Sequence, residues 1–317
     1  MIAMGVAEGD EVIVPSYSYI ATANAVRYVG AHPVFVDIEP GGFNLDPTRI
    51  EAAINDRTRL ILCVHQMGMP CDLERIVEIA QHHSLKLIED AACAVGSQIR
   101  WAGDWQNIGR PHADIACFSF HPRKVITTGD GGMLTTQDPE IDARLRLLRQ
   151  HGMSATDVVR HRSAEVIFET YEELGFNYRM TDIQAAVGRE QLKRLPQIVV
   201  RRREIAEIYR AELAKISGLR VPNEPAWCRS NWQSYCVRLP PKADQREVMQ
   251  ELLDLGISTR RGIMCAHREP AYSGHPLPHG LAESEAAQNG CILIPIYHTL
   301  SELDQLRVIE GLGRSLA

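Results

Sequence analysis

Several side chains that can take part in proton transfer or covalent chemistry come shortly after β-forming runs in the first part of the chain. Tyr19, Asp90, Ser119 and Lys124 all hold such positions. A lysine amine can act as a nucleophile or a base, and a carboxylate can stabilise a cationic ring. An amine, a carboxylate, a hydroxyl and an aromatic ring together suit a cationic, phosphorylated aromatic cofactor.

Each of these residues also has an ordinary structural explanation when it is taken alone. An aspartate at the end of a strand often caps the following helix, and a lysine in a glycine-flanked loop is usually solvated. The glycine-rich stretch at 127–132 matches neither a P-loop nor a dinucleotide-binding fingerprint. The order and context of the whole set therefore carry the interpretation.

The spacing of the remaining ligand-type residues does not favour metal or disulfide chemistry. The eight cysteines include no CxxC pair, and neither His65 with His82 and His83 nor His267 with His275 has convincing ligand spacing. We interpret the cysteines as buried free thiols of a reducing, cytoplasmic compartment. We expect no metal site.

Strands and helices alternate along the part of the chain that must position the reactive residues. Continuous apolar strands that alternate with helices favour a mainly parallel sheet covered on both faces, so we predict an α/β large domain. Ligands of such sheets bind beyond the carboxyl ends of the strands. The predicted strands are Glu11–Val14, Pro33–Asp37, Leu60–His65, Leu85–Glu89, Ile115–Ser119 and Met133–Thr136, and the predicted helices are Tyr19–Val29, Pro47–Ile54 and Leu73–His83.

The pattern changes after the loop that contains Lys124. We predict a helix over Asp138–His151, a polar excursion over Ser154–Glu173, and a long helical stretch over Thr181–Lys215 that is broken near Pro196. The boundary near residue 216 divides a large domain (1–215) from a small α+β domain (216–317). The elements predicted in the small domain are Ser234–Leu239, Arg246–Leu255, Ile257–Arg260, Leu293–Pro295 and Ser301–Leu312.

The composition narrows the classes of partner. The chain has 317 residues, 45% of them hydrophobic, and a formal net charge of -6. The negative charge argues against nucleic acid or an anionic membrane as the main partner. No apolar stretch approaches the ~18 residues that are needed to span a bilayer. We therefore expect a cytoplasmic protein that acts on small molecules.

A set of ordered motifs resembles the DegT/DnrJ/StrS family of pyridoxal-phosphate (PLP) sugar aminotransferases, which have the aspartate aminotransferase fold. The resemblance covers nearly the whole chain. Because several motifs match in order and with similar spacing, the resemblance is specific. The motifs are Gly9–Ser16, Pro33–Asp37, Ile88–Ala92, Phe118–Lys124, Gly129–Gly132 and Leu174–Arg179.

The resemblance implies a role for each matching residue. Lys124 would carry the cofactor and then move the reacting proton, and Asp90 would pair with the pyridine nitrogen. Tyr19 would stack on the ring, and Ser119 would bind the phosphate. Asn177 would reach the phosphate from the neighbouring subunit, so that a homodimer shares its active sites. By looser analogy, His267 would face the substrate.

The family's usual reaction transfers the amino group of glutamate to a keto-sugar that is linked to a nucleotide. Some relatives act on cyclitols or an aromatic precursor instead. A branch that dehydrates sugars has histidine in place of the lysine. Lys124 argues against that branch, and His121 is three residues away from that position.

Two features depart from the family pattern. Cys93 stands where many members have a glutamine near the cofactor hydroxyl, and a thiol can fill that space as a small hydrophobe. The segment from Met1 to Glu8 resembles the end of a helix that lies well inside the family's chain. We therefore expect that an upstream phosphate-binding Gly-Thr/Ser-Ala segment is missing. A second hypothesis follows, in which the chain is a catalytically impaired remnant that acts as a partner subunit or regulator.

Overall fold

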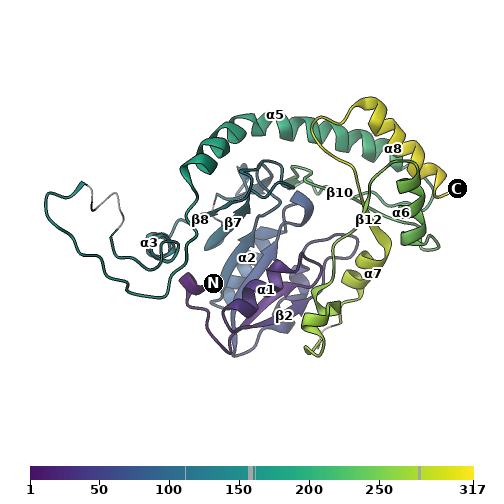
Figure 1. The fold of residues 1–317 in the computed structure, drawn as a ribbon. Helices are drawn as coiled ribbons and strands as arrows, with labels where there is room; N and C mark the ends of the chain where they lie inside the picture. The colour runs from purple at the N-terminus through teal and green to yellow at the C-terminus, as the bar shows by residue number, and fades with distance from the viewer. Residues whose placement is uncertain (111, 156–159, 161, 278–279) are drawn as a thin grey trace.

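The computed structural model describes residues 1–110, 112–155, 160, 162–277 and 280–317. Its central sheet is α/β and mainly parallel, as the sequence predicts (Figure 1). Only the edge strand β8 runs antiparallel to its neighbour. The strands, in spatial order, are β2 (His32–Val36), β1 (Glu11–Pro15), β3 (Thr58–Val64), β4 (Lys86–Asp90), β7 (Ile115–Ser119) and β8 (Gly132–Thr135).

Helices cover both faces of this sheet because its central strands are apolar on both sides. Val12 and Val14 of β1 lie in a buried cluster with α1 (Ala21–Tyr28) and α3 (Pro139–Leu148). Ile13, between them, lies in a second cluster with α2 (Leu73–His82). Side chains alternate across a strand, so consecutive residues of β1 serve opposite faces.

Two predicted helical features are wrong. The helix predicted over Pro47–Ile54 consists of two short 3₁₀ helices, Pro47–Arg49 and Glu51–Ala53. The break predicted at Pro196 does not occur, because α5 runs without interruption over Asp182–Leu213. Its residues Leu195 and Val199 pack against Gly96. Contacts of this kind offset the hydrogen bond that proline cannot donate.

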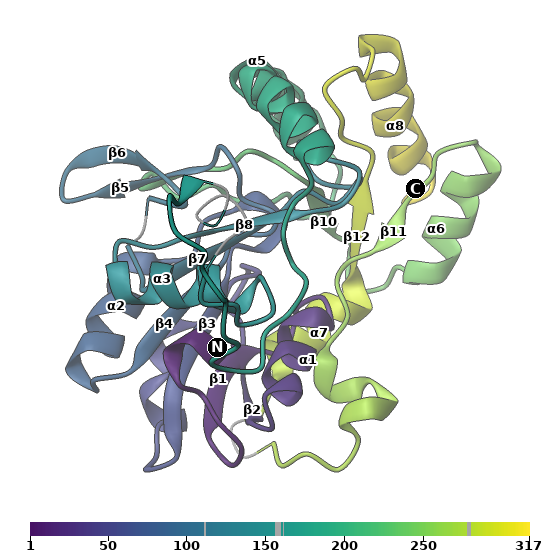
Figure 2. The same ribbon diagram turned by 60° about the vertical axis from the view of Figure 1, so that its left-hand side comes forward.

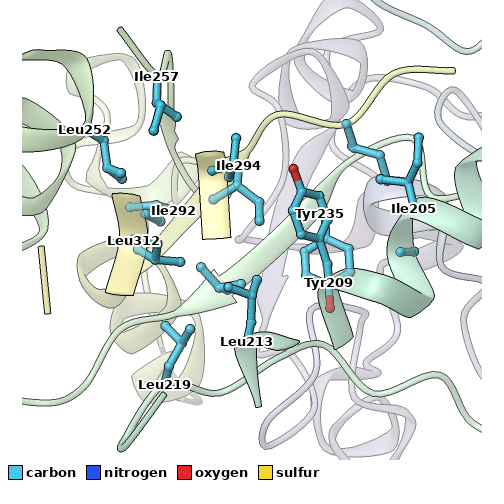
Figure 3. Close-up of a cluster of buried hydrophobic side chains, with 14 of the residues drawn as sticks. Ile205, Tyr209, Leu213, Leu219, Tyr235, Leu252, Ile257, Ile292, Ile294 and Leu312 are labelled. Carbon is cyan, nitrogen blue, oxygen red and sulfur yellow. The ribbon is translucent and has the colours of Figure 1, made fainter. Parts of the chain in front are cut away.

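The second half of α5 shares a core with the C-terminal part of the chain. Tyr209 and Leu213 of α5 pack with residues of a three-stranded sheet (Figure 3). The Tyr209 hydroxyl donates to the Pro295 carbonyl oxygen at 2.8 Å. The elements of this lobe are β10 (Tyr235–Arg238), α6 (Gln245–Asp254), β11 (Arg260–Arg261), α7 (Ala282–Gly290), β12 (Cys291–Ile294) and α8 (Glu302–Arg314). The domain boundary at residue 216 stays a prediction.

A third, small sheet was not predicted. It consists of β6 (Asp104–Asn107), β5 (Gln98–Trp101) and β9 (Cys228–Arg229). The β5–β6 hairpin projects from the body of the molecule, as Figure 2 shows. Its strands are short and polar, so they lack the apolar runs that indicated the central strands. Among the described residues, no helix is long and apolar enough to cross a membrane.

A cavity of about 60 Å³ lies between the lobes and contains an acidic group, Glu39. Burial, together with Asp72 and Asp46, raises the pKa of Glu39 from 4.5 to about 7. Between pH 4.5 and about pH 7, Glu39 therefore holds a proton in the folded protein that it has lost in the unfolded chain. As a result, the contribution of Glu39 to stability decreases as the pH rises through this window.

We expect the Glu39→Gln variant to gain stability relative to the wild type as the pH rises. The amide stays neutral, whereas the carboxyl must ionise in a partly buried position. The check is urea unfolding of both proteins at pH 5 and at pH 8. A difference in unfolding free energy that is the same at both pH values would contradict the prediction.

Candidate active site

The carboxyl ends of β4 and β7 bring two of the predicted residues to one edge of the sheet. Asp90 is the last residue of β4 and pairs in register with Cys117 of β7. Ser119 ends β7, and the loop that follows contains Lys124. The convergence that the sequence predicted at this edge is confirmed for these elements.

The side chain of Asp90 is held by two hydrogen bonds. Its Oδ2 accepts from the Thr22 hydroxyl at 3.1 Å, and its Oδ1 accepts from the Ala92 backbone N–H at 3.1 Å. The Thr22 hydroxyl also lies 2.8 Å from the hydroxyl of Ser18. A carboxylate has about four acceptor positions, so Asp90 can still accept a further N–H.

Glu89 directly precedes Asp90, and its side chain lies on the opposite face of the strand. Its Oε2 lies 3.0 Å from His65 Nε2, and both side chains are fully buried. His65 Nδ1 accepts from the Cys71 backbone N–H, so Nε2 carries the ring hydrogen and donates it to Glu89. His65 and Glu89 therefore form a structural pair that supports the end of β4.

Lys124 lies beside Cys93. The Lys124 Nζ donates to the Cys93 Sγ at 3.2 Å. Burial raises the pKa of the Cys93 thiol, and the nearby Lys124 partly opposes this effect. At neutral pH the lysine amine therefore has an uncharged thiol as its neighbour. The loop after β7 and the turn after β4 provide this contact.

Ser119, Tyr19 and Asn177 make no contact with the Lys124 or Asp90 side chains among the hydrogen bonds of the described residues. Ser119 Oγ accepts from the His121 backbone N–H at 3.3 Å. Tyr19 precedes α1 and is 65% exposed. Asn177 is exposed and lies on the long excursion between α3 and α5, where its backbone pairs with Gln150. The roles of these residues toward a cofactor stay predictions.

His267 joins the two lobes. Its Nδ1 lies 2.6 Å from the Ser16 hydroxyl, and its Nε2 lies 3.1 Å from Glu285 Oε1. The His267 side chain is only 5% exposed. This geometry gives His267 a packing role between β1 and α7, and its contact with substrate stays a prediction.

Three supporting residues were missed by the sequence analysis. Ser18 precedes α1 and Thr22 lies in its first turn, and their hydroxyls meet at 2.8 Å. No regular spacing in the sequence indicates this support of Asp90. Asn231 donates to the Cys93 carbonyl oxygen from 138 residues away, and no local pattern indicates such a contact.

The donor set fits pyridoxal phosphate. A partly buried amine, a fixed carboxylate with acceptor capacity and a hydroxyl lie at the same sheet edge. Lys124 would hold the aldehyde carbon, and Asp90 would accept the N–H of the pyridine ring. Over the described part of the chain, His, Cys, Asp and Glu side chains form no group of three that could hold a metal ion.

Comparisons with known proteins identify the family. The model of the DegT/DnrJ/EryC1/StrS aminotransferase family matches residues 1–313. A GDP-perosamine synthase of Caulobacter vibrioides is 41% identical over 100% of this chain and 82% of its own length. A GDP-perosamine synthase of Escherichia coli O157:H7 is 34% identical over 99% of this chain and 81% of its own length.

Solved structures show the same similarity. The aminotransferase TlmJ from Streptoalloteichus hindustanus has a TM-score of 0.89 and 34% identity over 100% of this chain and 81% of its own. The PLP form of the Streptococcus pneumoniae protein Spr1654, named a putative sugar aminotransferase, has a TM-score of 0.87 and 27% identity over 99% of this chain and 82% of its own. The fold is therefore that of the PLP-dependent aminotransferases. The chain belongs to the DegT/DnrJ/EryC1/StrS aminotransferase family, whose members use pyridoxal phosphate as cofactor.

Proposed function

We propose that this protein transfers an amino group from glutamate to a keto-sugar that is linked to a nucleotide. The observation that carries the proposal is the Lys124–Cys93 contact beside the anchored Asp90, in a chain similar over its whole length to two GDP-perosamine synthases. The S. venezuelae protein DesV, whose structure holds a ketimine intermediate, adds support at 35% identity.

The residues of this chain divide the chemistry between them. When bound, pyridoxal phosphate supplies an electron sink for the negative charge that develops at the amino carbon. Lys124 Nζ would act as the base that takes the proton from the amino carbon of the donor and then as the acid that returns a proton. Asp90 would keep the ring nitrogen protonated, and Thr22 and the Ala92 N–H hold its carboxylate in place for this task.

The test of the substrate class measures 2-oxoglutarate formed from glutamate. We expect product with a GDP-linked keto-sugar as acceptor, the class that the names of the two similar synthases suggest, and little or none with the free sugar or with simple keto acids. Equal rates with the simple keto acids would contradict the proposed acceptor. Absence of 2-oxoglutarate with every acceptor would favour the remnant hypothesis.

Exposed apolar side chains support the further proposal that the enzyme is a homodimer. Phe168, Leu174 and Tyr178 of the excursion and Ile183 at the start of α5 are 87%, 88%, 74% and 80% exposed. The excursion extends away from the rest of the chain (Figure 1). Large apolar side chains that stay exposed along one segment of the chain mark a surface that another protein covers. A second copy that covers this surface would bring its Asn177 toward the site of its partner.

Mixing two inactive variants tests the shared site. Heterodimers of Lys124→Ala and Asn177→Ala contain one doubly altered site and one intact site. Random mixing is therefore expected to restore about a quarter of the wild-type activity. Lys124→Ala mixed with Asp90→Asn is the matched control, because Lys124 and Asp90 belong to the same chain's site and no site in those heterodimers is intact. Equal activity of the two mixtures would contradict the placement of Asn177.

A further inference from the structure

The segment Ser230–Ser234 leads into β10 of the C-terminal lobe, which is called the small lobe below, and its Trp232 packs in the core of that lobe. The segment reaches the turn that carries Cys93. The side chain of Asn231 is fully buried there. Its Nδ2 donates to the carbonyl oxygens of Cys93 and Val95, each at 2.8 Å. An amide has two N–H donors, so both are used on this one turn. Asn231 therefore fixes the backbone on both sides of residue 94.

The other contacts of Asn231 leave it no freedom to move. Its Oδ1 accepts from the Gln233 backbone N–H at 2.8 Å, and its own N–H donates to the Ser97 hydroxyl at 3.0 Å. A Cβ on Gly68 would lie 1.9 Å from Asn231 Oδ1. Gly68 also has a φ of 91°, so both the space and the backbone conformation favour glycine there.

The same segment also reaches the loop of Lys124. Gln233 Nε2 donates to the Arg123 carbonyl oxygen at 3.2 Å, next to the lysine. The buried Arg202 of α5 donates to the Trp232 carbonyl oxygen at 2.8 Å and holds the segment from behind. The two loops whose side chains meet at the Lys124–Cys93 contact are thus attached to one rigid piece of the small lobe.

We propose that Asn231 and Gln233 are positioning residues that set the separation of Lys124 Nζ and Cys93 Sγ. Through them, the position of the small lobe determines the surroundings of the cofactor lysine. The inference rests on the proposed function, since it takes Lys124 as the residue that binds pyridoxal phosphate. Neither residue needs to touch the cofactor or the substrate for this role.

The experiment compares Asn231→Ala with a control, Gln245→Ala. Gln245 is partly buried, and its Nε2 donates to the carbonyl oxygens of Gln288 and Cys291 at 2.9 and 2.7 Å. Both substitutions remove two hydrogen bonds from a side-chain amide to backbone carbonyl oxygens, but those of Gln245 join α6 to the end of α7 and to β12.

Two quantities are measured: the midpoint pH of the absorption band of lysine-bound cofactor, and the rate of Cys93 alkylation in the protein without cofactor. We expect Asn231→Ala to shift the midpoint by about half a pH unit or more. We expect it to change the alkylation rate by about fivefold or more, because a thiol's reactivity depends on its neighbours and exposure. Gln245→Ala is expected to leave both quantities near their wild-type values.

Equal changes in the two variants would overturn the proposal, because they would show that loss of any buried hydrogen bonds loosens the whole structure, rather than that Asn231 sets the separation of Lys124 and Cys93. Wild-type values in Asn231→Ala would overturn it as well. If Asn231→Ala does not fold, Gln233→Leu removes the donor to the Arg123 carbonyl at a partly exposed position, and it must shift the midpoint in the same test. The alkylation arm needs no cofactor, so failure of the proposed function is distinguishable from failure of this inference.

Discussion

Replacement of Lys124 by alanine is expected to abolish amino transfer, with kcat falling about 10⁴-fold or more. The variant loses both the amine that holds the cofactor and the group that moves the proton. Two roles in one residue explain why the expected loss is larger than for any neighbour. The near-visible band of lysine-bound cofactor should disappear with the activity.

Two control variants show whether the loss of activity is specific to the amine of Lys124. Lys124→Arg keeps the positive charge near Cys93 but not the reactive amine, so it is expected to be as inactive as the alanine variant. Lys86→Ala removes an exposed lysine that pairs with Asp114 at the opposite end of β4, and it should keep wild-type activity. An active Lys124→Ala variant with an intact band would show that another residue holds the cofactor.

Replacement of Asp37 by alanine is expected to lower the free energy of unfolding by about 3–5 kcal/mol, more than any other substitution considered for its effect on stability. Asp37 is buried at the end of β2 and accepts from the backbone N–H groups of Glu283 and Ser284 at 3.0 and 2.7 Å. It also accepts from the Ser284 hydroxyl at 2.6 Å. The residue that precedes α7, Leu281, cannot cap this helix, so Asp37 caps it from the other lobe.

The control for this prediction is Asp244→Ala. Asp244 caps α6 through the backbone N–H groups of Arg246 and Glu247, but it does so locally and at the surface. Its loss should cost about 1 kcal/mol. Urea and thermal unfolding, followed by circular dichroism, compare the two variants. The account of Asp37 is contradicted if its loss costs no more stability than the loss of Asp244.

The residues of the site that could be predicted are those that follow apolar strands. The runs that end near Asp90 and Ser119 are largely apolar, and each has buried residues at its centre or start, so their type, their direction and the edge where they meet follow from pattern alone. The specific roles of Lys124 and Asp90 depended on the family resemblance as well, because a single lysine or aspartate carries little information.

What could not be predicted depends on contacts between distant parts of the chain. Pro196 normally ends a helix, but packing of Leu195 and Val199 on Gly96 keeps α5 continuous. The cap that Asp37 gives to α7 joins residues that are 246 and 247 apart. Such contacts leave no periodic signal, and only the folded chain brings them together.

The most direct test of the central claim is the absorption spectrum of the purified protein after addition of pyridoxal phosphate and removal of the excess. We predict a near-visible band that glutamate shifts as its amino group is transferred, and that borohydride reduces to a stable adduct on the peptide containing Lys124. A protein that shows no band, or one whose adduct lies on a different lysine, would contradict the assignment of Lys124 as the cofactor-binding residue.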